Sequence, residues 1–291
     1  MSGKAIVVVI LAIVLIVIGI VGGLIYQEWK EWTSPWGTPQ DEILIEIERG
    51  MTARQIAELL VEQGILQDTT FFLIMADLRG FGGDLKAGEY MIRGDQSPND
   101  IVRMIDHHQI YRHPILFPEG ITRHEIAQVL EENEICSASA FLEITGGAAA
   151  FQNTGMRPST PTAEGFLFPD TYYLEKNLDP GRVRDRMLRR FNEVYEELRQ
   201  EVPGDERWWE REEEGSLPAL VTLASLVERE AKRDEDRPLV ASVFRNRLDK
   251  GMKLQSDATI RYILDDWTNP LKVSDFEIDD PYNTFKYKGL P

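Results

Sequence analysis

The sixteen residues LPALVTLASLVEREAK, at positions 217–232, decide how the C-terminal half of the chain folds. They are apolar nearly all round up to Val227 and charged directly afterwards, which predicts a helix that reaches the surface at its end. The neighbours of Glu228 by helical spacing are all small or apolar: Val221, Ala224, Ser225 and Ala231. A carboxyl group on such a face is partly desolvated, which favours its protonated form and suits a general acid.

Two features of this segment leave the interpretation open. Glu228 is also the first residue that would be exposed where a buried helix reaches the surface. Its position can therefore be explained without a catalytic role. Lys232, four residues on, would oppose a raised pKa if it folded back as an ion pair. Glu230, in contrast, lies among other charges and is expected to be solvated.

The N-terminal segment predicts a membrane span. Residues 5–26 are uncharged and rich in Val, Ile and Leu, and about 20 such residues cross the hydrocarbon core. The run is longer than the apolar core of a secretory signal peptide, and it lacks a cleavage site of small residues. The aromatic residues of a membrane interface follow: Tyr26, Trp29, Trp32 and Trp36. We therefore predict a cytoplasmic tip at 1–4, a single-pass transmembrane helix at 5–26, and an extracytoplasmic remainder on the cytoplasmic (inner) membrane.

Composition excludes several classes of function. The formal net charge of −17 repels nucleic acid and anionic lipid headgroups, and favours a neutral or zwitterionic substrate. Cys136 is the single cysteine, so an internal disulfide is excluded. All four histidines lie between His107 and His124, which excludes a histidine-based triad or zinc site built from the C-terminal half. His107, His108 and His113 form either a metal site or, as we predict, a surface loop. No metal and no cofactor is therefore expected.

An internal repeat organises the middle of the chain. Residues 43–47 are a β-type run, and Thr52 with Gln55 has the spacing of a helix capping box. Seventy positions on, residues 115–117 precede Thr122 and Glu125 in the same arrangement. Each copy predicts a strand, a capped turn and an amphipathic helix.

The resulting fold class is α+β. We predict a linker at 27–40, a compact α+β module at 41–112, and a mainly helical domain at 113–291. A long helix at 180–202 carries an arginine stripe: Arg182, Arg184, Arg186, Arg189 and Arg190. Glutamates follow at neighbouring helical positions, which favours a self-paired, solvated face over an anion-binding stripe.

The remaining polar residues suggest glycan chemistry. Cleavage of a glycosidic bond needs a proton donor at the leaving oxygen, and ordinary hydrolases add a second carboxylate, for which the candidates are Glu164, Asp170 and Asp257. Residues 164–173 have the aromatic composition of a sugar-stacking wall, although a core strand that ends in a turn is favoured. The side chains suited to hydrogen bonding with a sugar are Gln255, Asp257, Tyr262 and Asn283.

Several motifs, in order, resemble the endolytic murein transglycosylase (YceG-like) family. They are residues 223–230, residues 237–259 with Val243-Phe244-x-Asn246-Arg247-Leu248 and Leu254-Gln255-Ser256-Asp257, the box from Glu164 to Tyr172, Tyr282-Asn283-Thr284, Gly289-Leu290-Pro291, Lys86-Ala87-Gly88-Glu89-Tyr90 and Pro118-Glu119-Gly120. The resemblance covers essentially everything after the linker. The family pattern continues past Pro291, so the catalytic domain is expected to be truncated at its C-terminus.

The resemblance implies a membrane-anchored enzyme with a LysM-like module that acts on peptidoglycan strands. Glu228 would protonate the oxygen between N-acetylmuramic acid and N-acetylglucosamine, and then act as base toward the muramyl C6 hydroxyl. The product would carry a 1,6-anhydro end, and nascent strands would be terminated beside penicillin-binding proteins. The expected substrate-binding residues are Gln255, Asp257, Tyr262, Asn283, Glu164 and Tyr172.

Two alternatives stay open at this stage. A non-catalytic, membrane-tethered peptidoglycan-binding scaffold would bind strands without cutting them. A lysozyme-like hydrolase that uses Glu228 with Asp257 would place solvent oxygen in its product.

Overall fold

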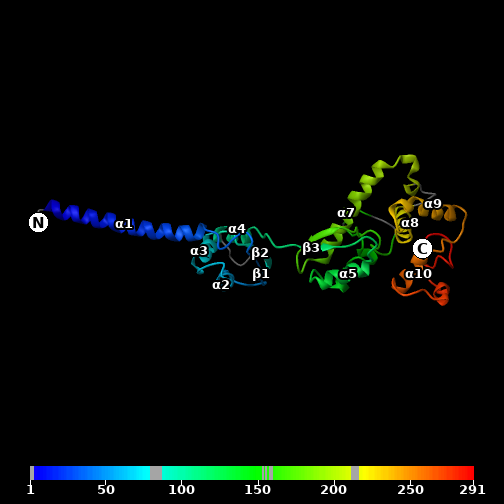
Figure 1. The fold of residues 1–291 in the computed structure, drawn as a ribbon, viewed down its shortest axis with the longest axis horizontal. Helices are drawn as coiled ribbons and strands as arrows, with labels where there is room; N and C mark the ends of the chain where they lie inside the picture. Colours follow the sequence, from blue (N-terminus) through cyan, green and yellow to red (C-terminus); the bar gives the residue numbers. More distant parts are fainter. Residues whose placement is uncertain (1–2, 79–86, 153, 155, 157–159, 211–215) are drawn as a thin grey trace. The chain divides into compact units, whose positions relative to one another are not determined.

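The computed structural model describes residues 3–78, 87–152, 154, 156, 160–210 and 216–291, and the chain divides into two compact units, Met1–His113 and Pro114–Pro291 (Figure 1). Lys86 of the motif quoted above lies outside these residues. Both helices and sheet are present, as the α+β prediction requires.

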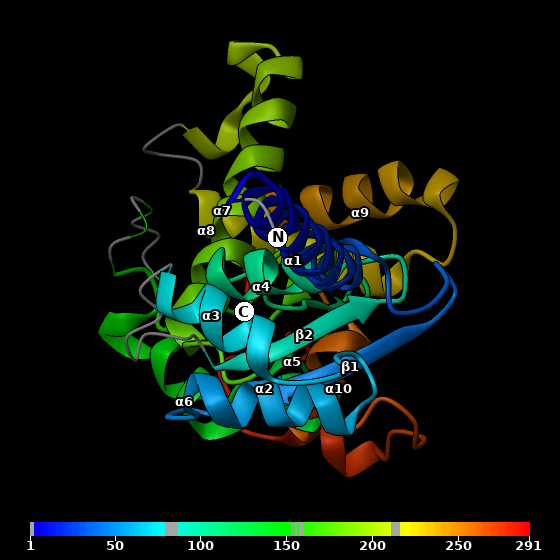
Figure 2. The same cartoon turned by 90° about the vertical axis from the view of Figure 1, so that its left-hand side faces the viewer.

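The first unit is built on an antiparallel strand pair. Strand β1 (Glu42–Ile47) pairs with β2 (Gly88–Arg93) so that Ile45 lies opposite Tyr90, and Figure 2 shows the two strands side by side. Helices α2 (Ala53–Glu62), α3 (Thr70–Leu78) and α4 (Pro98–Asp106) complete it. The alternation of β1 buries Ile45 and Ile47 against apolar residues of these helices.

Helix α1 covers Gly3–Thr33. Of the helices that the structure describes, none combines the length and the apolar character that a membrane crossing demands. The hydrocarbon core requires about 20 predominantly apolar residues in one helix. This finding contradicts the transmembrane helix predicted at 5–26, its single-pass topology and the inner-membrane location, and these predictions are wrong.

Two of the four aromatic residues predicted to form an interfacial belt pack on the first unit instead. The Trp32 ring lies 4.7 Å from that of Phe71, centroid to centroid. The Trp36 indole Nε1 donates a hydrogen bond of 2.9 Å to the carbonyl of Arg93. The indoles thus bury their apolar surface against protein.

The histidines of the first unit divide between two settings. His107 and His108 are exposed at the end of α4, in agreement with the predicted surface loop. His113 differs, because its Nε2 contacts the carboxylate of the buried Glu89.

The second unit opens with the second copy of the repeat. Strand β3 (His113–Leu116) leads to α5 (Arg123–Glu132), and β3 forms a two-stranded sheet with β4 (Thr171–Leu174). Capping boxes are present in both copies, Thr52 with Gln55 and Thr122 with Glu125. The predicted capped turns are therefore confirmed. Helix α6 (Ala138–Ile144), which the sequence reading missed, packs between α5 and α7 (Pro180–Glu201).

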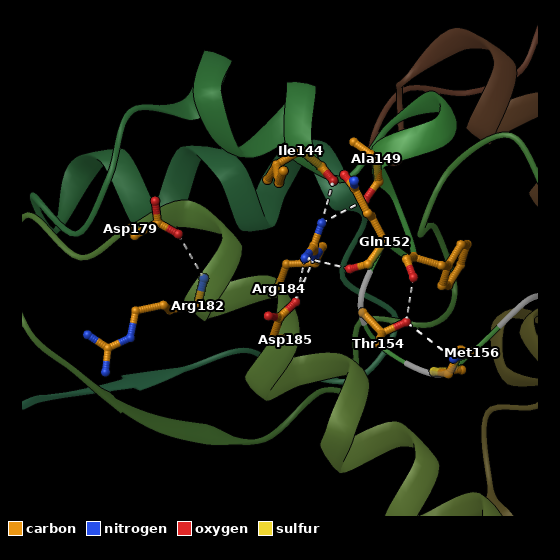
Figure 3. Close-up of polar contacts among 10 residues, drawn as sticks. Ile144, Ala149, Gln152, Thr154, Met156, Asp179, Arg182, Arg184 and Asp185 are labelled. Carbon is orange, nitrogen blue, oxygen red and sulfur yellow. Dashed lines mark hydrogen bonds and ion pairs between the residues drawn. The ribbon is translucent and has the colours of Figure 1, made fainter.

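Helix α7 corrects one prediction made from charge patterning. Arg184 is not on a solvated face, because its guanidinium is buried and donates hydrogen bonds to the carbonyls of Ile144, Ala149 and Gln152 (Figure 3). It also pairs with Asp185 at 2.6 Å. Arg184 thereby fixes the loop after α6 to α7. Arg190 does follow the prediction, since it pairs with Glu193 at 3.6 Å.

The last part of the second unit is helical. Helix α8 (Leu217–Glu230) contacts α9 (Arg237–Asp249) and α10 (Asp257–Leu264), and Figure 1 shows α8 beside α9. Leu223, Leu226 and Val227 of α8 pack with Phe244 and Leu254 in a separate apolar cluster. This face anchors α8, and the opposite face is left for the site described next.

Candidate active site

A cavity of about 690 Å³ lies in the second unit. The segments around it are the loop before α5, residues 160–169, α8, α10 and the chain end. Its charged lining residues are Glu119, Arg123, Glu164, Glu228, Arg229 and Arg237. Its aromatic lining residues are Phe166, Phe168, Phe191, Tyr262, Trp267 and Tyr282. This volume lies within the range of about 300–1,000 Å³ typical of ligand pockets.

Glu228 lies on the wall that α8 contributes. Val221, Ala224 and Ser225, which share its helical face, line the cavity with it. The side chain is half-buried, and burial is the largest cause that raises the pKa of its carboxyl above the ordinary value. Glu119 adds to this rise, while Arg229 and Arg237 oppose it. Helix α8 ends at Glu230, so Lys232 is not on a continuing helical turn above Glu228.

A second carboxyl group, that of Glu164, lines the same cavity. Its Oε2 accepts a hydrogen bond of 3.0 Å from the backbone N–H of Arg123 at the start of α5. Burial nevertheless raises the pKa of Glu164, and this hydrogen bond only partly opposes the rise. The cavity therefore holds two carboxyl groups with raised pKa values, a combination typical of acid–base sites.

Tyr262, on α10, is the other predicted sugar-binding residue that reaches the cavity. Its ring lies 5.3 Å from that of Tyr282, centroid to centroid, and both rings line the cavity. Burial is the main cause that raises the pKa of the Tyr262 hydroxyl, so the group stays protonated at neutral pH and can donate a hydrogen bond.

The other predicted site residues are placed elsewhere. Gln255 is exposed at a backbone φ of +51°, and Asp257 is exposed in the first turn of α10. Asn283 is fully buried, and its amide Nδ2 donates to the carbonyls of Phe276 and Ile278. The hydroxyl of Tyr172 donates to the carbonyl of Phe168. None of these four residues lines the cavity, although Asn283 and Tyr172 shape segments next to it.

Arginine side chains at the cavity were missed by the sequence reading. Arg229 donates to the carbonyl of Gly120 and lies 3.8 Å from the centre of the Trp267 ring. Arg237 pairs with Glu119 at 3.7 Å and with Asp234 at 3.2 Å. The sequence offered only a weak signal for them, because charged residues after an apolar helix are usually solvated.

A buried polar cluster connects α8 to α10. Ser256 Oγ donates to the carboxylate of Glu230 at 2.5 Å, and Ser256 N donates to Thr284 Oγ1 at 3.0 Å. Thr259 and Thr284 share a hydrogen bond of 2.9 Å between their hydroxyls. Glu230 is exposed, as expected, and its carboxylate is the group by which α8 joins this cluster. The cluster holds α10, and with it Tyr262, against the helix that carries Glu228.

The segment at 164–173 differs from the favoured alternative of a core strand that ends in a turn, because the turn at 164–166 precedes the strand. Phe166 and Leu167 are buried in the core of the second unit, and strand β4 begins only at Thr171. Phe168 and Pro169 line the cavity. The segment is therefore a core element whose exposed edge forms part of the cavity wall.

Replacing Gly165 by Ala should destabilise the protein more than a replacement at another left-handed glycine. Gly165 has a φ of +78°, and an added Cβ would lie 2.8 Å from Val221 Cγ1 of α8. Backbone strain should cost about 1 kcal/mol, and the clash should add roughly 1–2 kcal/mol, measured by urea unfolding. Gly251→Ala is the matched control, because Gly251 has a φ of +61° and open space around it. Equal losses in the two variants would contradict the close contact with α8.

The chain matches a known family over most of its length. Residues 45–291 match the model of the YceG-like family. The endolytic murein transglycosylase of Streptococcus pneumoniae serotype 2 (strain D39) is 28% identical over 280 residues, which cover 85% of this chain and 49% of that relative. The endolytic murein transglycosylase of Bacillus subtilis (strain 168) is 27% identical over 260 residues, covering 84% and 70%. The chain thus spans about half the length of the pneumococcal relative.

A solved structure shows the same architecture. A putative yceG-like protein of Listeria monocytogenes matches with a TM-score of 0.54 and 25% identity, covering 87% of this chain and 85% of that one. None of these matches supports the LysM-like description of residues 41–112.

Proposed function

We propose that this chain, which belongs to the YceG-like family, cleaves peptidoglycan strands as a lytic transglycosylase in which Glu228 is both acid and base. The observation that carries this proposal is the placement of Glu228 on the wall of a large cavity, with the pKa of its carboxyl raised mainly by burial. The names of the two relatives, both endolytic murein transglycosylases, support the same reaction class.

The proposed reaction needs a single carboxyl group from the protein. Protonated Glu228 gives its proton to the glycosidic oxygen, and the bond from that oxygen to the muramyl C1 breaks. The developing positive charge at C1 is then captured by the C6 hydroxyl of the same sugar, whose proton passes to Glu228. The new C1–O6 bond closes a 1,6-anhydro ring, and Glu228 returns to its starting state. Water is not consumed, so no second carboxylate is required as a nucleophile.

The remaining cavity residues suit a sugar chain. Aromatic rings of Phe168, Trp267 and Tyr282 supply flat apolar surface, and the Tyr262 hydroxyl can donate a hydrogen bond. Glu164 is half-buried near the start of α5, where its carboxylate accepts a hydrogen bond from the backbone N–H of Arg123. We infer that Glu164 and Tyr262 bind the sugars next to the scissile bond. Cleavage within nascent strands, which would end their elongation, and association with wall-synthesis proteins belong to the same proposal.

Activity should decrease as the pH rises through the pKa of Glu228. The protonated carboxyl is the working form, and a raised pKa extends that form to higher pH than an ordinary glutamate allows. The alkaline limb of kcat/KM against pH should therefore have its midpoint above the ordinary glutamate pKa. The measurement uses soluble glycan strands. An alkaline limb with its midpoint at or below the ordinary glutamate pKa would contradict the role assigned to the buried carboxyl.

Digestion of purified sacculi tests the proposal against a scaffold that only binds. Soluble fragments with 1,6-anhydromuramyl ends, identified by chromatography and mass spectrometry, are the expected result. Sacculi that bind the protein and stay uncut would instead support the scaffold.

A further inference from the structure

Glu119 lies at the rim of the cavity, on the loop that joins β3 to α5. It lines the cavity together with Glu228, although the two residues come from distant parts of the sequence. Its side chain is 73% exposed, so water screens its charge when the cavity is open. A bound sugar chain would displace that water and strengthen any interaction between the two carboxyl groups.

Two arginines hold this loop in place. Arg229, the residue after Glu228, donates to the carbonyl of Gly120 and is itself stacked on the Trp267 ring at 3.8 Å. Arg237, at the start of α9, contacts the Glu119 carboxylate at 3.7 Å. Gly120 has a φ of +73°, and an added Cβ would meet the Arg229 guanidinium at 3.4 Å. The loop at Glu119 and Gly120 is therefore contacted by side chains from two different helices.

The charges around Glu228 act in opposite directions. Burial is the first cause of its raised pKa, and the Glu119 carboxylate raises that pKa further. Arg229, on the same helix, and Arg237, on α9, lower it. Arg123, Glu164, Tyr262 and Tyr282 are the other titratable and charged side chains that line the cavity. Because Arg237 contacts Glu119, it holds that carboxylate in place. It also opposes the effect of that carboxylate on the pKa of Glu228.

We propose that Glu119 is a positioning residue that keeps the Glu228 carboxyl in its proton-carrying form, and that Arg237 restrains this effect. The inference rests on the proposed function, in which a protonated Glu228 starts the reaction. Glu119 takes no part in the proton transfers of this scheme. Its negative charge acts on Glu228 and stabilises the protonated form of that carboxyl group.

Carbon-13 NMR of the full chain, with glutamate labelled at its carboxyl carbon, tests this inference without catalysis. The signal of Glu228 is the one that disappears in Glu228→Gln. In Glu119→Gln its titration midpoint should fall by about 0.5–1 pH unit, because a like charge has been removed. In Arg237→Gln the midpoint should rise by a similar amount. Glu143→Gln is the matched control, since Glu143 is an exposed glutamate outside the cavity lining.

The alkaline limb of kcat/KM should move with the NMR midpoint, to lower pH in Glu119→Gln and to higher pH in Arg237→Gln. A midpoint in Glu119→Gln equal to that of the parent or of Glu143→Gln overturns the inference. That result would leave the proposed function intact if Glu228→Gln is still inactive. Full activity of Glu228→Gln would instead remove the proposed function, whatever the NMR midpoints show.

Discussion

Replacing Glu228 by Gln should lower the rate of glycan cleavage roughly 1,000-fold, since a positioned general acid contributes about 100- to 10,000-fold. Gln keeps the size and the hydrogen-bonding shape of the side chain but holds no transferable proton. The reaction has no other carboxyl group assigned to this proton, so the loss should appear in kcat. The rate is measured as the release of soluble fragments from purified sacculi.

Stability and binding serve as controls for this variant. Glu228→Gln removes a charge from a half-buried position, so its unfolding temperature should equal or exceed that of the parent. Glu235→Gln is the matched control, because Glu235 is exposed on the short segment after α8 and does not line the cavity. Binding of glycan strands should persist in both variants. A Glu228→Gln protein that cuts strands at the parent rate would disprove the assignment.

Replacing Arg184 by Ala should destabilise the second unit by about 3 kcal/mol, the cost of leaving several buried carbonyl groups without a charged donor. Arg184 is only 5% exposed and donates hydrogen bonds to Ala149 at 2.6 Å and to Gln152 at 3.1 Å (Figure 3). The unfolding temperature should fall by roughly 5–10 °C. Differential scanning calorimetry measures the shift.

Arg182→Ala is the matched control for Arg184. Arg182 lies on the same helix, but its side chain is exposed and points away from the carbonyl groups in Figure 3. Its replacement should change stability by less than about 0.5 kcal/mol. Equal effects of the two substitutions would show that the buried contacts of Arg184 contribute little.

Local signals predicted much of the secondary structure. The two capping boxes fixed the starts of α2 and α5, because an N-cap hydroxyl satisfies backbone N–H groups whatever the tertiary context. The apolar face around Glu228 also predicted that its carboxyl would be partly desolvated. The structure agrees with this prediction, since the Glu228 side chain is half-buried and burial is the largest cause that raises its pKa.

Tertiary contacts explain what the sequence did not reveal. The charge pattern predicts a solvated stripe that includes Arg184, because glutamates follow the arginines at neighbouring helical positions. Its helical neighbours Val183, Met187 and Leu188 are all buried, and this pattern outweighs the charge pattern. The membrane span predicted at 5–26 rested on residue type alone, and the described helices do not support it.

The site was predicted only in part, because sequence proximity does not give spatial proximity. Gln255 precedes α10 and Asp257 is the first residue of that helix, yet both are exposed outside the cavity lining. Asn283 was chosen for its amide, which serves the backbone of its own loop. The arginine contacts to Gly120 and Glu119 join segments more than a hundred residues apart, and no local pattern encodes them.

A lytic transglycosylase breaks the glycosidic bond without water, so the oxygen at the new chain end distinguishes it from a hydrolase. Sacculi are digested by the parent protein in water labelled with heavy oxygen, and the muropeptide ends are analysed by mass spectrometry. We expect unlabelled ends that are lighter than reducing ends by the mass of one water, as a 1,6-anhydro ring requires. Reducing ends that carry the heavy oxygen would contradict it and would identify a hydrolase.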